Sequence, residues 1–181
     1  MQHTIKLPDR LQAIADLIDG GASVADIGTD HGFLPVYLAQ TGARRGIIAS
    51  DKSAGSLKAA RRSAEKYGVT DKITFIVAPG LTGIDESEAD TIVIAGVGGE
   101  TIIGILEETP WTKNGKRLIL QPQTKIDLLL DYLSENGYEI LETRRVSDKG
   151  RTYTVLSVES GKWKVESGKW KVESGKWKVE S

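Results

Sequence analysis

Residues 24–32 read Val-Ala-Asp-Ile-Gly-Thr-Asp-His-Gly, and this stretch decides the fold. An apolar run ends at the acidic Asp26, and Gly28 and Gly32 then bracket a tight turn into a helical pattern. A strand, a glycine-flanked turn and a helix in this order are typical of a βα unit that holds a nucleotide-sized ligand at the mouth of a parallel sheet.

The spacing of this motif narrows the ligand. Asp-x-Gly-x-x-x-Gly differs from the Gly-x-Gly-x-x-Gly of dinucleotide-binding proteins, and Asp30 stands where a middle glycine is expected. A carboxylate at that position repels a pyrophosphate. The motif therefore favours a ligand that lacks one.

Composition bounds the class of protein. The chain has 181 residues, 39% apolar and 27% charged, which is usual for one globular domain. It has no cysteine, which excludes disulfides and thiolate metal sites. The first eight residues contain no apolar signal segment, and no run approaches the roughly 20 apolar residues of a membrane span. We expect a cytoplasmic protein without membrane contact.

Net charge does not by itself indicate a nucleic-acid binder. The whole chain carries −1, but residues 161–181 contribute six Lys and three Glu. Residues 1–160 hold the remaining 18 basic and 22 acidic residues, a net charge of −4. Any surface for nucleic acid must therefore be local.

Apolar periodicity predicts alternating strands and helices. Strands are expected at 23–27, 46–50, 73–77, 91–95 and 117–121, and helices at 11–18, 34–40, 57–67, 101–108 and 125–136. The continuous apolar runs of the third and fourth strands are typical of strands covered on both faces. A final antiparallel pair, 138–145 and 151–159, is joined by an Asp-Lys-Gly turn. The prediction is an α/β, Rossmann-like sandwich with a mostly parallel seven-stranded sheet.

The C-terminal residues repeat. Ser-Gly-Lys-Trp-Lys-Val-Glu occurs three times unchanged between Ser160 and Glu180. We interpret 161–181 as a disordered or appended tail and 1–160 as the ligand-binding domain. The alternation within each repeat also suits short strands with Ser-Gly turns, and Trp between Lys suits stacking on nucleic-acid bases.

Asp51 ends the second predicted strand, 23 residues after Gly28. An acidic side chain there can accept hydrogen bonds from both ribose hydroxyls of an adenosine-containing ligand. The alternative interpretation is a helix N-cap. The upstream motif favours the ribose role.

Three further segments follow predicted strands on the same rim. Pro79 follows the third strand and cannot bind adenine through its side chain, which leaves backbone groups, Asp85 or Glu86. The run 96–99 (Gly-Val-Gly-Gly) suits either close approach of a ligand or a tight turn. Gln121-Pro122-Gln123 suits either readout of a base edge or termination of the strand by proline.

His31 has no neighbouring ligand residue that would indicate a metal site. It could orient Asp30, line the pocket or lie at the helix start without a special role. We expect no metal.

With these residues in place, the chain resembles the bacterial tRNA (adenine-22-N1)-methyltransferase family within the class I S-adenosylmethionine (SAM) enzymes. The resemblance covers 7–159 and rests on four segments, 7–11 (Leu-Pro-Asp-Arg-Leu), 25–35, 90–99 and 118–123. The Asp-His pair of the first motif, combined with the later Ala-Gly-x-Gly-Gly, is more specific than a general SAM signature. It implies SAM as cofactor and tRNA as partner; the oligomeric state stays open.

The resemblance also implies residue roles. Asp30 falls on the family's acidic position near the transferred methyl group, which makes it the expected catalytic residue. The expected cofactor-binding residues are Asp26, Gly28, Thr29, His31, Gly32, Asp51, Lys52, Gly80, Leu81, Ala95 and Gly96, and the expected substrate-binding residues are Val97, Gly98, Gly99, Gln121, Pro122 and Gln123.

The sequence departs from the family pattern at Phe33, Pro79, Val97 and Gln123. The family also continues into a helical C-terminal domain that helps to grip tRNA, and here the repeat follows instead. The expected reaction is in-line attack of adenine N1 on the sulfonium methyl group, driven mainly by orientation. Two alternatives are a SAM-binding module without catalytic output and a nicotinamide oxidoreductase, which the glycine spacing disfavours.

Overall fold

The computed structural model describes residues 3–42, 44–161, 163–166 and 169–172. Its helices are α1 (Asp9–Asp16), α2 (Phe33–Thr41), α3 (Ala54–Lys66), α4 (Gly99–Glu107) and α5 (Ile126–Glu135), with short 3-10 turns η1 (Thr70–Lys72), η2 (Glu86–Glu88) and η3 (Pro110–Lys113). Its strands are β1 (Gly21–Ile27), β2 (Arg44–Asp51), β3 (Thr74–Val77), β4 (Thr91–Val97), β5 (Arg117–Pro122), β6 (Tyr138–Asp148), β7 (Arg151–Ser160), β8 (Trp163–Glu166) and β9 (Lys169–Val172).

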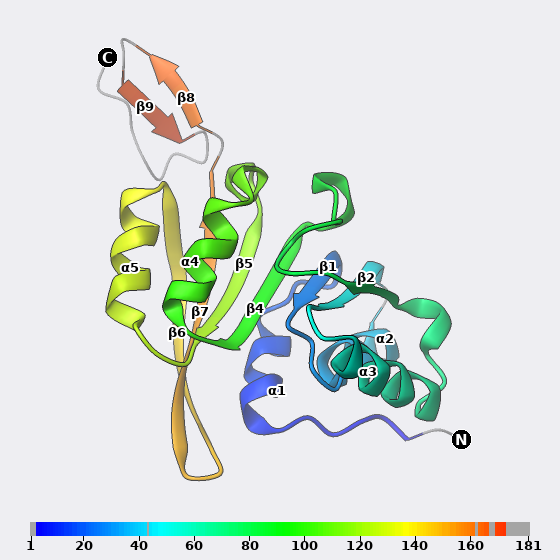
Figure 1. Cartoon of the computed structure of the whole chain (residues 1–181). Coiled ribbons are helices and arrows are strands. Elements are labelled where there is room, and N and C mark those ends of the chain that lie inside the picture. Colours follow the sequence, from blue (N-terminus) through cyan, green and yellow to red (C-terminus); the bar gives the residue numbers. More distant parts are fainter. Residues whose placement is uncertain (1–2, 43, 162, 167–168, 173–181) are drawn as a thin grey trace.

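Strands β1 to β7 form one sheet in the order β3-β2-β1-β4-β5-β7-β6 (Figure 1). The first five run parallel, whereas β7 pairs antiparallel with both β5 and β6. The order reverses between β1 and β4, and ligands of open α/β sheets bind at such a switch point, beyond the carboxyl ends of the strands. The predicted doubly wound sheet with a terminal antiparallel pair is confirmed.

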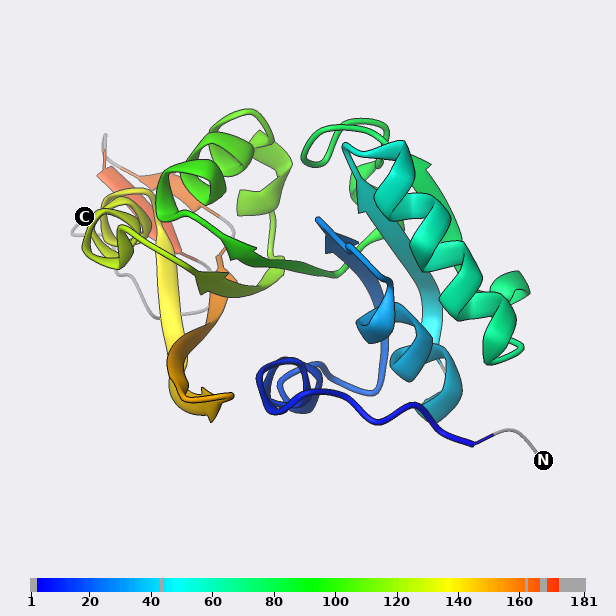
Figure 2. The ribbon, with the colours of Figure 1, turned by 60° about the horizontal axis from the view of Figure 1, so that its bottom comes forward.

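Helices cover both faces of the sheet. Alternate residues of each central strand point to opposite faces, and because both sets are apolar, each face needs to be covered. One apolar cluster joins α1, α2 and α3 to residues such as Val24 and Val93, and the other joins α4 and α5 to residues such as Ala25 and Ile92. Figure 2 shows α4 and α5 on one side of the sheet and α1 on the other. Among the described residues, no helix is long and apolar enough to cross a bilayer.

The expectation that the third strand is covered on both faces is wrong. β3 begins at Thr74 and forms an edge of the sheet, paired only with β2 among the described strands. Val77 is 57% exposed, and Phe75 and Ile76 are half-buried. The apolar run is real, but an edge position leaves part of it uncovered.

The β6–β7 hairpin extends from the sheet and lies beside α1 (Figure 2). Its turn contains Lys149 at φ +50° and Gly150 at φ +79°, which is the paired left-handed geometry of a tight hairpin. The backbone N–H of Arg10 donates to the Asp148 carboxylate at 3.3 Å. The hairpin is thereby attached to the start of the chain.

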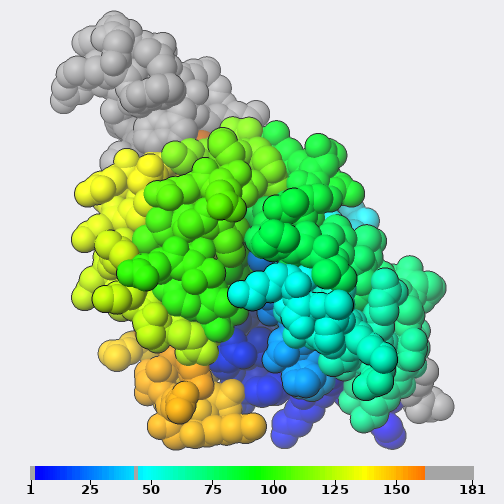
Figure 3. Space-filling view, in the orientation of Figure 1, coloured from blue at the N-terminus to red at the C-terminus, as the bar shows by residue number. Residues whose placement is uncertain are grey.

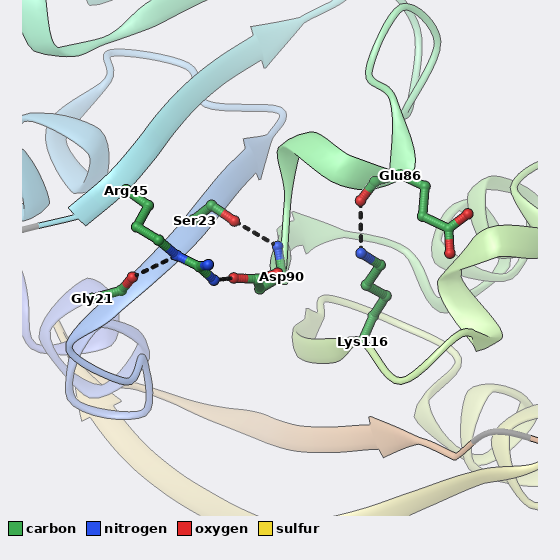
Figure 4. Close-up of polar contacts among 6 residues, drawn as sticks. All are labelled: Gly21, Ser23, Arg45, Glu86, Asp90 and Lys116. Carbon is green, nitrogen blue, oxygen red and sulfur yellow. Dashed lines mark hydrogen bonds and ion pairs between the residues drawn. The ribbon is translucent and has the colours of Figure 1, made fainter.

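Polar contacts hold the connections at the amino ends of the parallel strands (Figure 4). Arg45 forms an ion pair with Asp90 and donates to the Gly21 carbonyl at 3.3 Å. The backbone N–H of Asp90 donates to the Ser23 hydroxyl at 2.9 Å. These contacts lie at the end of the sheet opposite to the carboxyl ends of the strands, where a ligand is expected to bind.

Two of the three repeats contribute strands. β8 and β9 pair antiparallel, with Trp163 opposite Val172, and the predicted Ser-Gly turn between them lies outside the described residues. The third repeat, in 173–181, lies outside the described residues. The boundary at 160/161 and the appended nature of the tail stay predictions.

Candidate functional site

The turn after β1 is built from left-handed backbone. Gly28, Asp30 and Gly32 have φ values of +74°, +55° and +72°. The N–H groups of Gly28 and Thr29 both donate to the Ser50 carbonyl, at 2.8 and 3.0 Å. These bonds fix the turn against the end of β2.

Asp51 joins this turn to the next one. Its carboxylate accepts the Asp30 N–H at 3.1 Å and the Ser53 N–H at 2.9 Å. The N-cap of α3 is Ser53, whose hydroxyl accepts the Ser56 N–H at 3.2 Å. The helix-cap interpretation of Asp51 is therefore wrong.

Asp26 lies beneath the turn and is buried. The Thr29 hydroxyl donates to its carboxylate at 2.8 Å. Burial raises the pKa of Asp26 to about 6, even though the Thr29 hydrogen bond and the charge of Arg10 act in the opposite direction. Ionisation of this carboxyl group therefore costs free energy. The Thr29 hydroxyl and the Arg10 charge are the main groups that stabilise its ionised form.

A cavity of about 640 Å³ opens where β1, β2 and β4 end. Its volume suits a nucleoside-sized ligand. In the space-filling view, the surface is hollowed between the green residues around α4 and the cyan residues near the start of α3 (Figure 3). The predicted site residues that line it are Gly28, Asp30, Asp51, Lys52, Gly80, Ala95, Gly96, Val97 and Gln123.

A smaller cavity of about 180 Å³ adjoins the first. The two share Arg10, Gly28, Asp30 and Ala95. The smaller one adds three further predicted residues, Asp26, Thr29 and His31. Asp30 therefore stands at the junction of the two spaces.

Gly28 faces open space. A Cβ built on it would meet no atom within 4 Å, so the missing side chain leaves room in the cavities that Gly28 lines. Gly32 differs, because its Cβ would lie 2.7 Å from the Ala60 Cβ of α3. Gly28 is available to a ligand, whereas Gly32 permits close packing of α2 on α3.

Several other predicted residues lie outside the two cavities. A Cβ on Gly99 would lie 2.5 Å from the Lys125 carbonyl oxygen, and one on Gly98 would lie 3.0 Å from the Thr124 hydroxyl. Both glycines thus allow α4 to begin against the loop before α5. Leu81 is 4% exposed and belongs to the core.

Gln121 is fully buried and its amide is engaged. Its carbonyl oxygen accepts from the Arg10 guanidinium at 3.0 Å, and its NH₂ donates to the Pro122 carbonyl at 3.1 Å. Gln121 therefore holds Arg10, while Gln123 is exposed and lines the larger cavity.

Arg10 is a site residue that sequence reasoning missed. Its guanidinium also lies over the Tyr153 ring, 5.7 Å from the centroid. The only sequence signal was its place in the segment 7–11. Also missed were Thr101 and Ile105 of α4 and its C-cap residue Glu108, which line the larger cavity and share one helix face at this spacing.

His31 lies beside Asp30, with 3.8 Å between its Nε2 and the Asp30 carboxylate. Its ring stacks on Phe33 at a centroid distance of 5.4 Å. Among the residues that the structure places, no group of three His, Asp or Glu could hold a metal ion.

Pro79 lines the larger cavity, as do its neighbours Ala78 and Gly80. Asp85 and Glu86 do not line it. Asp85 caps the η2 turn, accepting the Ser87 N–H at 3.0 Å, and Glu86 accepts from Asn114 at 2.8 Å. Backbone groups of 78–80 are thus the nearest partners for a base bound beyond β3.

Comparison with known proteins agrees with this geometry. Residues 7–156 match the family model of a methyltransferase domain. A tRNA (adenine(22)-N(1))-methyltransferase of Bacillus subtilis is 38% identical over 160 residues, covering 88% of this chain and 67% of that protein.

Solved structures show the same similarity. The B. subtilis m1A22 tRNA methyltransferase TrmK superposes with a TM-score of 0.79 at 36% identity, covering 86% of this chain and 67% of that one. A Streptococcus pneumoniae protein solved in complex with S-adenosyl-L-methionine gives 0.80 at 34% identity, covering 87% and 75%.

Proposed function

This chain belongs to the family of tRNA (adenine(22)-N(1))-methyltransferases, and from that premise we propose that it methylates N1 of an adenine in tRNA with SAM as the methyl donor. The observation that carries the proposal is the position of Asp30, at the junction of two cavities with its backbone held by Asp51. A tRNA substrate would place the reaction in the bacterial cytoplasm.

The residues at the larger cavity fit SAM. Gly28 leaves open space in the cavity wall, and the Asp51 carboxylate lines the cavity at the end of β2, where an adenosine ribose is held in related folds. Ala78, Pro79 and Gly80 offer backbone groups to a base, and Ile105 offers an apolar surface. When bound, SAM supplies an electrophilic methyl group on a positively charged sulfur.

Charges on the protein suit the two ends of such a ligand. Arg10 is the cation shared by the two cavities, and it suits a carboxylate. Asp30 is an exposed carboxylate shared by the same spaces, and it suits a positive centre. Asp26 and Thr29 contribute polar groups to the smaller cavity, and the charge of Arg10 acts favourably on the Asp26 carboxylate.

Asp30 has a second task at the target base. Adenine N1 has its own lone pair, so no residue must deprotonate the nucleophile before transfer. A carboxylate can hydrogen-bond the exocyclic amino group, hold the base in line and accept a proton after transfer. Gln123 and the backbone at 96–97 border the same space and are proposed to position the base.

A SAM-binding module without catalytic output is the alternative, and it is not favoured. The relatives that cover most of this chain include a tRNA methyltransferase and a structure with SAM, and Asp30 is presented at the cavity junction. A nicotinamide oxidoreductase is disfavoured by Asp30, whose carboxylate lies in the glycine-flanked turn where a dinucleotide's pyrophosphate would bind.

The direct test is transfer of tritium from [methyl-³H]SAM to bulk tRNA that lacks modifications. We expect incorporation that depends on the protein and that Asp51→Ala lowers by weakening SAM binding. SAM binding measured by calorimetry, with no incorporation into any tRNA, would select the binding-module alternative.

A further inference from the structure

A third cavity, of about 410 Å³, lies between the loop that precedes α5 and the start of β7. Its lining includes Gln123, Thr124 and Lys125 from the loop, and Arg151, Thr152 and Tyr153 from the strand. Of these, only Gln123 also lines the larger SAM-sized cavity. A ligand in the third cavity would therefore sit beside the reaction site.

The chemistry of this third cavity favours an anion. Lys125 and Arg151 are exposed, and neither forms an ion pair with any residue that the structure describes. No described lining residue carries a carboxylate. The hydroxyls of Thr124 and Thr152 add donors of the kind that commonly contact phosphate and sugar.

The loop that carries Lys125 is fixed to the main site. The Gln123 N–H donates to the Val97 carbonyl at 2.8 Å, and the Thr124 carbonyl accepts the Gly99 N–H at 2.8 Å. Gly99 makes the second contact possible, since any Cβ there would strike the Lys125 carbonyl. The cation is thus held at a set place relative to the end of β4.

The strand side of the cavity is also attached to the site. Tyr153 lies under the Arg10 guanidinium, and Arg10 is held by Gln121. Arg151 is the first residue of β7, directly after the left-handed turn at Lys149 and Gly150. Both cations therefore belong to backbone that is anchored to residues of the reaction site.

We propose that this third cavity binds the phosphodiester backbone of the tRNA strand next to the target adenine, with Lys125 and Arg151 as its phosphate contacts. This inference rests on the proposed function, because it assumes an RNA substrate at the shared wall formed by Gln123. It explains how a domain whose residues 1–160 carry a net charge of −4 can hold a polyanion: the cations are gathered locally.

The test compares the double variant Lys125→Gln/Arg151→Gln with a matched control, Arg62→Gln/Lys72→Gln. The control removes two exposed cations near the opposite end of the parallel strands. Glutamine at 125 demands no more of the left-handed backbone than lysine does. The measurements are KM for unmodified tRNA, direct tRNA binding as a function of salt, and SAM affinity by calorimetry.

We expect the double variant to raise KM for tRNA on the order of tenfold and to lower the slope of log Kd against log salt by about 1 to 2. SAM affinity should match the wild type, and the control should change neither quantity. An unchanged tRNA affinity and salt slope in a wild-type background that does methylate tRNA would overturn this inference alone. Loss of SAM affinity would overturn it too, by assigning the cavity to the cofactor. A wild type that binds SAM but transfers no methyl group would overturn the proposed function instead.

Discussion

At the residue scale, the site depends on carboxylates that differ in environment. Asp26 is buried and its pKa is raised to about 6, whereas Asp30 is exposed at the cavity junction and Asp51 accepts two backbone N–H groups. Asp26 supports the turn from beneath, and its buried charge lowers the stability of the protein. Asp30 can contact a ligand directly, and Asp51 orients the turn that carries Asp30.

Asp30 is the residue whose loss should separate catalysis from binding. Its φ of +55° is a conformation that asparagine tolerates well, so Asp30→Asn keeps the backbone while removing the charge. We expect methyl transfer to be abolished and SAM affinity to weaken less. Single-turnover transfer and calorimetry measure the two effects, and Asp85→Asn, at a carboxylate outside the cavities, serves as the control. An active Asp30→Asn enzyme would remove Asp30 from the mechanism.

Asp26 should give the protein a recognisable pH dependence. Its pKa is about 6 in the folded chain against 3.8 in an unfolded one, so between these values the folded chain binds more protons. The free energy of unfolding therefore falls as the pH rises from about 4 to about 6, by roughly 3 kcal/mol in total from this group.

Asp26→Asn cannot ionise and still offers an oxygen to Thr29. We expect the variant to lack that decline, and so to exceed the wild type in stability at pH 7 while matching it near pH 4. Urea unfolding at a series of pH values measures the difference. Parallel pH profiles for the two proteins would show that Asp26 is not the buried acid described here.

At the element scale, the order of strands and helices could be predicted because each follows from local periodicity. Which strands and helices pack against one another could not be predicted, since this is set by contacts between residues distant in the sequence. Burial of 73–77 depended on β3 lying at an edge, and the structural reasons for Gly32 and Gly99 lie in Ala60 and Lys125. Arg10 joined the site through Gln121, 111 residues away.

Substitution can distinguish a turn glycine that leaves space for a ligand from one that permits close packing of two helices. Gly28 and Gly115 both have φ +74° and open space where a Cβ would project, so Gly28→Ala and Gly115→Ala should each cost about 1 kcal/mol in stability. Only Gly28→Ala should weaken SAM binding, because only Gly28 lines the cavity. Gly32→Ala should cost more, about 2 to 4 kcal/mol, since Ala60 must also move.

Urea unfolding and SAM calorimetry on the three variants supply the comparison. Gly115→Ala is the control for backbone strain. Equal loss of SAM affinity in Gly28→Ala and Gly115→Ala would mean that strain, rather than the filled cavity, causes the effect.

At the scale of the whole molecule, the two ends of the parallel strands differ in role: polar contacts stabilise the amino ends, and the cavities lie at the carboxyl ends. Ion pairing and hydrogen bonds at Arg45, Asp90 and Ser23 hold the amino ends of the strands (Figure 4). The carboxyl ends open into three adjoining cavities, connected through Arg10 and Gln123. The sheet order places the first two at the switch point between β1 and β4, and the third lies beyond the end of β5, beside the start of β7.

Ligand-induced stabilisation reports on this arrangement as a unit. SAM at 100 times its Kd should raise the free energy of unfolding by about 2.7 kcal/mol, while NADH should leave it unchanged. Thermal unfolding with each ligand gives the comparison. Stabilisation by NADH rather than SAM would contradict the ligand inferred from Asp30 and from the spacing of the glycines around it.

The most direct measurement is the identity and position of the product nucleoside. Unmodified tRNA transcripts, with adenosine or guanosine at position 22, are incubated with SAM and the full chain, and their nucleosides are analysed by mass spectrometry. The account predicts 1-methyladenosine from the adenosine transcript and none from the other. Equal methylation of both transcripts, or none of either with SAM bound, would contradict it.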